Sequence, residues 1–307
     1  MNWIVVIAIA VLSDALRIFI DNFASDVYFK EKGAVSQKIV SGLVYAIAGV
    51  LIFAFNGFDP TTITPLAIGL LVLSGISSSL AGIPYFKALE IDDSTNIGIF
   101  FQFAPILYLI SGWAIGSETF AFTQLIGAII ILAAPILVVL TAKKRSRKIR
   151  FKAALLAFIS IIFYVASGEL FIQTDTSSLG LFGAIGIILI AKGLSDVIII
   201  GGRRKWRRRL TKVIKSSRRK VLVPISAAVV MRLVQEFSYR IGLVIAPSVA
   251  IASAASDSVE PIAIFFMGLM LTVIWPKFGR EKLQKKTVLV HFIATVLVVI
   301  GIVIMQL

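Results

Sequence analysis

Long apolar runs are the feature that most constrains this chain. About 20 apolar residues allow an α-helix to cross the hydrocarbon core of a bilayer, and runs of that length recur throughout the 307 residues. They predict ten membrane-spanning helices, at Trp3–Phe29, Gln37–Phe55, Pro65–Leu89, Thr95–Ile115, Phe120–Leu140, Phe151–Ile172, Leu179–Ile200, Val221–Ile245, Val249–Trp275 and Thr287–Met305. We therefore expect an all-α polytopic membrane protein.

The composition supports this class and argues against others. Hydrophobic residues make up 58% of the chain and charged residues 15%, whereas about a quarter of a soluble domain is charged. The sequence has no cysteine, which excludes disulfides, thiolate metal sites and cysteine nucleophiles, and its one histidine, His291, argues against a histidine-rich metal centre. We find no cofactor motif and no nucleophile–base pair, so we expect neither an enzyme nor a bound cofactor.

The positive charges predict how the chain crosses the membrane. Lys and Arg occur in the loops after odd-numbered spans or, as with Lys87, at the end of the span before the loop, while the even-numbered loops and both ends contain none. Loops rich in Lys and Arg stay on the cytoplasmic side. The odd-numbered loops are therefore predicted to be cytoplasmic and both termini extracytoplasmic, in a plasma (cell inner) membrane.

The loop Arg203–Lys220 holds the densest positive charge. Trp206, Leu210, Val213 and Ile214 share one face of a helix within it, which is typical of a short amphipathic helix on a membrane surface. Its bases would attract anionic lipid headgroups. A purely topological role of these charges is the alternative, and we do not expect nucleic acid as a partner.

The two halves of the chain look like weak copies of each other. Three pairs of positions carry the match: Phe86–Leu89 with Tyr239–Gly242, Pro105 with Pro261, and Glu118 with Glu281. With five spans in each half, the second copy enters the membrane from the opposite side. This predicts an inverted-topology repeat, a common construction of secondary transporters, with one repeat at residues 1–142 and the other at residues 143–307.

At these residues the chain resembles the drug/metabolite transporter superfamily, specifically its EamA-type members. The resemblance is carried by short stretches in both halves: Ala88-Leu89, Pro105, Gly116-Ser117-Glu118, Gln124 and Gly127, and then Pro261-Ile262, Glu281-Lys282-Leu283 and Gly301-Ile302. It implies ten helices, a central cavity between the two halves and export or uptake of a small metabolite. It does not fix the substrate.

Apart from groups that we place near the membrane surfaces, we select ten ionisable residues inside the predicted spans. They are Asp14, Arg17 and Asp21 in the first span, Lys192 and Asp196 in the seventh, Arg232, Glu236 and Arg240 in the eighth, and Asp257 and Glu260 in the ninth. A charge at the bilayer centre costs about 2.5–3.5 kcal/mol, so it usually finds a partner or lines a cavity. These residues either hold helices together in pairs or form a polar pathway for substrate or protons.

We select as pathway candidates Asp14, Arg17, Lys192, Asp196, Arg232, Glu236, Asp257 and Glu260. Acids outnumber bases among the ten, which favours the pathway. Glu260 is the first candidate for a proton carrier, because Pro261 leaves the backbone carbonyl of Asp257 without its usual hydrogen bond, and we expect its carboxylate to be unpaired.

The sequence therefore predicts a secondary transporter of a small metabolite that works by alternating access, with proton coupling. A flippase for a lipid-linked or amphipathic substrate and a purely structural membrane protein are the alternatives.

Overall fold

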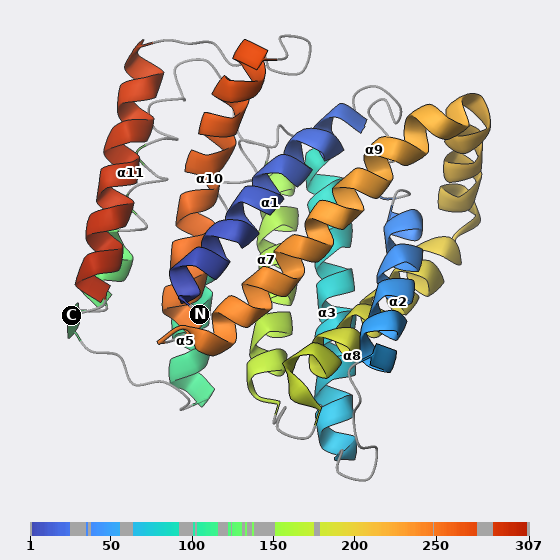
Figure 1. Ribbon diagram of the computed structural model, residues 1–307, viewed down its shortest axis with the longest axis horizontal. Coiled ribbons are helices and arrows are strands. Elements are labelled where there is room, and N and C mark those ends of the chain that lie inside the picture. Colours follow the sequence, from blue (N-terminus) through green and yellow to red (C-terminus); the bar gives the residue numbers. More distant parts are fainter. Residues whose placement is uncertain are drawn as a thin grey trace. The chain divides into compact units, whose positions relative to one another are not determined.

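The computed structural model describes residues 2–24, 35, 38–55, 64–91, 101, 103–115, 122–123, 125–130, 133, 137, 151–174, 179–247, 249–274 and 285–305. The regular structure of this part of the chain is helical (Figure 1). Its elements are α1 (Trp3–Ala24), α2 (Lys38–Phe55), α3 (Pro65–Leu89), α5 (Ala104–Ile115), α7 (Phe151–Ile172), α8 (Gly180–Ser195), the π-helix η3 (Asp196–Ile200), α9 (Arg204–Ile245), α10 (Val249–Ile274) and α11 (Lys285–Met305).

Several predicted spans coincide with observed helices. The observed ends of α3 and α7 are the predicted ones, and α2 and α10 each differ by one residue. Within the described residues, five stretches are long and apolar enough to cross a membrane: α1, α2, α3, α7, and α8 together with η3. The predicted span Phe120–Leu140 lies largely outside the described residues, although residues 125–130 are helical. The all-α prediction is confirmed for the described part, while the count of ten spans and the inverted repeat stay predictions.

The basic segment and the eighth predicted span form one helix. We expected the loop Arg203–Lys220 to be separate from Val221–Ile245, but α9 runs from Arg204 through to Ile245. Neither glycine nor proline occurs before Pro224 in this segment, so nothing in it stops the helix. The positive charges therefore extend an apolar helix instead of interrupting the chain.

The chain divides into two compact units, and each combines separate stretches of sequence. Unit 1 comprises Met1–Phe19, Asp92–Ala154 and Val234–Leu307, and unit 2 comprises Ile20–Ile91 and Leu155–Leu233. Each unit thus takes residues from both predicted repeats. The two repeats, divided at residue 142, stay a prediction about the sequence.

Unit 2 is built around α2, α3, α7 and α8, whose directions follow from their contacts. Ser74 hydrogen-bonds to Ser167, and Ser160 to Ala81, so α3 and α7 are antiparallel. Ser79 bonds to Asp196, while the α-carbon of Gly75 faces the backbone of Ile188 and Lys192, so α3 and α8 are parallel. The predicted topology numbers α2, α3, α7 and α8 as spans two, three, six and seven. It therefore predicts that α3 is antiparallel to α7 and parallel to α8, in agreement with these contacts.

Small residues allow α8 to lie close to its neighbours α2 and α3. Gly42 and Gly49 on α2 face Gly193 and Gly186 on α8, and a β-carbon on Gly49 would lie 2.7 Å from the carbonyl oxygen of Gly186. Helices in membranes commonly associate through such residues, because close backbones gain van der Waals contacts. Both pairs of glycines are seven residues apart along their helices, which places them on one face.

The start of α9 covers one end of unit 2. Trp206 and Leu210 are buried there in a core with Val35, Ile39, Phe86 and Ile200. We expected these two side chains on the apolar face of a surface helix. That face exists, but in the structure it packs against protein. The side chain of Val213 lies outside the described residues, and Ile214 packs at the edge of the same core.

Unit 1 contains most of α1 together with α5, α10, α11 and the last part of α9. α10 packs against α5 and α11 (Figure 1). Ala128 and Ile251 form a small core with Trp3 and Leu109, which joins three of these elements. Gly242 of α9 leaves room for Ile7 of α1, because a β-carbon there would collide with the Ile7 side chain.

Candidate functional site

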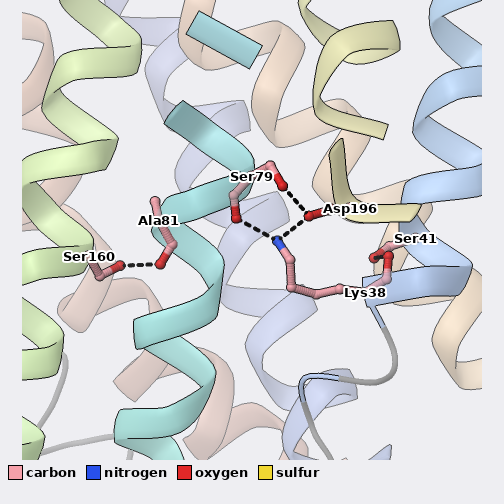
Figure 2. Close-up of polar contacts among 6 residues, drawn as sticks. All are labelled: Lys38, Ser41, Ser79, Ala81, Ser160 and Asp196. Atoms are coloured by element: carbon pink, nitrogen blue, oxygen red, sulfur yellow. Dashed lines mark hydrogen bonds and ion pairs between the residues drawn. The ribbon is translucent and has the colours of Figure 1, made fainter. Parts of the chain in front are cut away.

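A buried ion pair joins α2 to the end of α8. The ammonium nitrogen of Lys38 lies 2.9 Å from Asp196 Oδ1 (Figure 2). Lys38 is the first residue of α2 and Asp196 the first of η3, so the pair lies near the ends of both elements. By the predicted orientation of the spans, both ends belong to the cytoplasmic side.

Ser79 of α3 completes the cluster. Its hydroxyl donates to Asp196 Oδ1 over 2.5 Å, and its backbone carbonyl accepts from Lys38 Nζ over 3.2 Å. Figure 2 shows Lys38, Ser79 and Asp196 converging from α2, α3 and η3. We call these three residues the polar cluster; it connects three helices through a single carboxylate and a single ammonium.

The polar cluster is closed to solvent. Lys38 is 3% exposed, and Ser79 and Asp196 are both 0% exposed. Removing one partner of such a pair costs about 3–5 kcal/mol, because the remaining charge stays buried without compensation. The two charges are therefore strongly dependent on each other.

Backbone features around the cluster explain how it fits between the helices. A β-carbon at Gly82 would collide with Lys38 Nζ, and one at Gly42 would lie 2.7 Å from Cβ of Asp196. Glycine at both positions leaves the volume that the two charged side chains occupy. Asp196 also opens a π-helical turn that ends at Ile200, and π-helical turns inside α-helices are frequent at functional sites.

One oxygen of the cluster has no hydrogen bond within the described part of the chain. Lys38 and Ser79 both bind Oδ1 of Asp196, whereas Oδ2 is buried and has no partner among the described residues. Buried carboxylate oxygens normally accept at least one hydrogen bond. Oδ2 is thus the open position of the cluster.

A second buried cation lies one turn from Asp196. Lys192 is 3% exposed, and its ammonium sits 5.0 Å from the centre of the Tyr45 ring, a distance at which the ring face attracts a cation. Lys192 and Asp196 are predicted together from their spacing, and the structure places both in the core of unit 2. They turn to different groups of α2, namely Tyr45 and Lys38.

The predicted candidates of the first and eighth spans pair within their own helices. Arg17 binds Asp14 over 2.6 Å, and Arg240 binds Glu236 over 2.7 Å. Their spacings of three and four residues place each pair on one helical face. All four side chains also make other interactions within the chain, so their role in a pathway stays a prediction.

The structure describes the candidates near Pro261 only in part. Glu260 is half-buried and interacts with other groups of the chain, so it is not the unpaired acid that we expected. The side chain of Asp257 lies outside the described residues. Arg232 is half-buried and also has an interaction partner.

Sequence reasoning missed two buried charges of unit 2. Lys38 fits the pattern of the cytoplasmic loop charges, although its position at the start of an apolar run could have shown that it enters the bundle. Glu169 lies inside the sixth predicted span, where no Lys or Arg occurs three or four positions away in the sequence, and it is 8% exposed in α7. Both are buried, as Lys192 and Asp196 are.

The exposed side of the first part of α9 carries positive charge. A shallow hollow of about 690 Å³ there is lined by Arg204, Arg207, Arg208, Thr211, Lys212 and Lys215. These residues lie on the side of the helix opposite the buried Trp206 and Leu210. Within the described residues, no group of His, Asp and Glu side chains is arranged to hold a metal ion.

Several apolar helices of spanning length, packed around a buried ionic cluster, define a multi-pass α-helical membrane protein. Residues 23–140 match the model of the EamA-like transporter family, which confirms the resemblance to EamA-type members and indicates a membrane transporter of small molecules. The matched segment contains Lys38 and Ser79, while Asp196 lies beyond it.

Comparison with solved structures shows the same fold. A crystal structure described only as that of a protein shares it with a TM-score of 0.61, over 98% of both chains and at 14% sequence identity. At this identity the likeness concerns the fold alone. No curated protein matches the chain.

Proposed function

We propose that this chain is a secondary transporter that moves a small metabolite across the plasma (cell inner) membrane by alternating access between its two predicted repeats. The observation that carries the proposal is the buried pair of Lys38 and Asp196, inside helices of which α2 and α3 match the EamA-like model. Charges in membrane helices are expensive, and they commonly mark substrate and ion pathways.

The polar cluster can connect a change of helix position to binding. Separating Lys38 from Asp196 leaves two buried charges, each of which costs several kcal/mol without a partner. A polar solute, water or a proton that reaches the cluster can replace the lost partner. The pathway residues proposed are Lys38 and the predicted candidates Asp14, Arg17, Lys192, Asp196, Arg232, Glu236, Asp257 and Glu260, with proton coupling as the driving force.

Reconstitution tests the proposal and requires no assumption about the identity of the substrate. Purified protein in liposomes is challenged with a panel of small polar metabolites under an imposed proton gradient, and charge movement is recorded on a solid-supported membrane. We expect at least one compound to give currents that the double variant Lys38→Met/Asp196→Leu lacks. Lys87→Gln is the matched control, since Lys87 lies at the exposed end of α3. Equal currents in the double variant would contradict a role of the cluster in transport.

The exposed basic hollow of α9 favours one alternative, a flippase for an amphipathic or lipid-linked substrate. Its guanidinium and ammonium groups can hold a phosphate-bearing headgroup. In liposomes with a fluorescent lipid in one leaflet, a flippase makes a fraction of the label accessible to a membrane-impermeant quencher. Lipid movement without metabolite currents would replace the transporter proposal with this one.

A further inference from the structure

Asp196 uses only one of its two carboxylate oxygens in the polar cluster. The bonds from Lys38 Nζ and Ser79 Oγ both end on Oδ1, while Oδ2 is buried and without a partner within the described residues. Oδ2 can still bind a group that is small enough to fit into the closed site. A proton is the smallest such group, and it would leave both bonds on Oδ1 in place at the moment it arrives.

We propose that Asp196 is the binding site of the coupling proton, with Oδ2 as the atom that accepts it and Lys38 as the counter-ion that the proton releases. The proposal rests on the proposed transport function, and it names the ion and the residue that carry the coupling. Proton and Lys38 compete for one negative charge, so binding of either weakens the binding of the other.

The charge balance gives the competition its direction. With Asp196 ionised, the charges of Lys38 and Asp196 cancel. A proton on Oδ2 makes the carboxyl neutral, and the ammonium of Lys38 then loses the negative charge of Asp196 in a closed site. Lys38 moves toward water when the site takes up a proton, and it returns when the proton leaves. No covalent bond other than the O–H bond forms or breaks.

The surroundings of Asp196 make Lys38 its dominant electrostatic partner. α2 contributes Lys38 and Tyr45. The Tyr45 ring holds Lys192, which lies on α8 one turn before Asp196. From α3 comes the neutral Ser79, while Lys87 lies at the exposed end of that helix. Lys192 is thus the second cation near the carboxylate, and it is already engaged by an aromatic ring.

The backbone next to Asp196 is built for a change of position. The π-helical turn Asp196–Ile200 follows α8 directly, and its i→i+5 hydrogen bonds depart from the regular i→i+4 pattern of an α-helix. Gly42 and Gly82 give Lys38 and Asp196 their space without a side chain of their own. The site can therefore open through α2 and η3.

Infrared difference spectroscopy tests the proton site directly and needs no substrate. Purified protein is stepped from alkaline to acidic pH, and the C=O stretch of newly protonated carboxyl groups is recorded. We expect a buried carboxyl band that Asp196→Asn removes and Glu90→Gln, an exposed acid at the end of α3, keeps. A full set of carboxyl bands in Asp196→Asn would overturn the proposal.

The second measurement follows the release of Lys38, and it uses the absence of cysteine from the sequence. Ser41→Cys places the only thiol of the chain one turn beyond Lys38 on α2, at a buried position. We expect a membrane-impermeant thiol reagent to label it at least tenfold faster at acidic than at alkaline pH, after correction for thiolate content with Thr211→Cys on the exposed side of α9. The same corrected rate at both pH values would contradict the release of Lys38.

The two proposals fail in different ways. If the Asp196 band and the acid-dependent labelling are present but no metabolite moves in liposomes, the proton site stands and the transport function is wrong. If metabolites move under a proton gradient with equal coupling in Asp196→Asn, transport stands and this proton site is wrong. Carboxylate bands of Asp196 that shift with sodium ions, without a protonated carboxyl band at acidic pH, would assign the site to a metal cation instead, and would overturn the proposal.

Discussion

Gly42 and Gly193 face each other so closely across α2 and α8 that neither position has room for a side chain. A β-carbon on Gly42 would lie 2.9 Å from the Gly193 carbonyl oxygen, and one on Gly193 would collide with the Gly42 carbonyl oxygen. The same approach brings Asp196, three residues after Gly193, within reach of α2. The ionic contact between the two helices thus depends on their glycines.

A large side chain in this contact should destabilise the protein. We expect Gly193→Leu to lower the free energy of unfolding by about 3 kcal/mol, because the clash is with backbone atoms that cannot rotate away. Thermal unfolding in detergent measures the change. Gly69→Ala is the control, since a β-carbon at Gly69 meets nothing within 4 Å, and it should be neutral or stabilising by up to about 1 kcal/mol. Equal melting temperatures for Gly193→Leu and the native protein would refute the close contact.

The ion pair predicts a non-additive double variant. Lys38→Met and Asp196→Leu should each destabilise the protein by about 3–5 kcal/mol, because each leaves one buried charge alone. The double variant should unfold close to the native protein, since two apolar side chains replace the pair. Reversible unfolding in mixed micelles gives the three values. A double variant that loses the sum of the single losses would show that the two side chains act independently.

The burial of Trp206 predicts a difference between two tryptophans. Trp206 is 8% exposed and Trp113 is 74% exposed, so only Trp113 can touch lipid. Two variants that each keep one of the four tryptophans are placed in membranes of brominated lipid, which quenches fluorescence on contact. We expect strong quenching of Trp113 and weak quenching of Trp206. Comparable quenching of both would contradict the burial of Trp206, and it would support the predicted amphipathic helix on the membrane surface.

The charge pattern predicts the topology. A reporter fused after Leu307 should register as extracytoplasmic, and one inserted next to Ser146 as cytoplasmic, because the even-numbered loops and both ends contain no Lys or Arg. The compartment of each reporter is read from its enzymatic activity in cells. Opposite locations at both sites would invert the predicted orientation, and one shared location would break the predicted number of spans.

Helix positions could be read from the sequence because lipid imposes a minimum apolar length. The observed ends of α3 and α7 match the predictions, as an apolar run in each case begins and ends at a polar or turn-forming neighbour. The join of the basic segment to α9 could also have been found, since no glycine or proline separates Arg204 from Val223. There the dense charge suggested a loop, although charge alone does not end a helix.

The partners of the buried charges could not be read in the same way. Lys38 lies where the positive-inside rule expects a loop base, and its partner Asp196 belongs to another part of the sequence. Spacing on one helix shows which residues share a face, and this correctly grouped Arg17 with Asp14 and Glu236 with Arg240. It contains no information on which helices lie next to each other, so the contact that defines the polar cluster appeared only in the structure.

The interleaving of the chain in unit 2 has a consequence for biogenesis. α2 and α3 leave the ribosome before the helices that complete their packing, because α7 begins only at Phe151 and α8 only at Gly180. Until Asp196 emerges, Lys38 has no carboxylate from η3, and its long side chain can reach the headgroup region from the end of α2. Insertion into the membrane and assembly of the bundle are therefore separate events for this protein, and the ion pair closes only after the second.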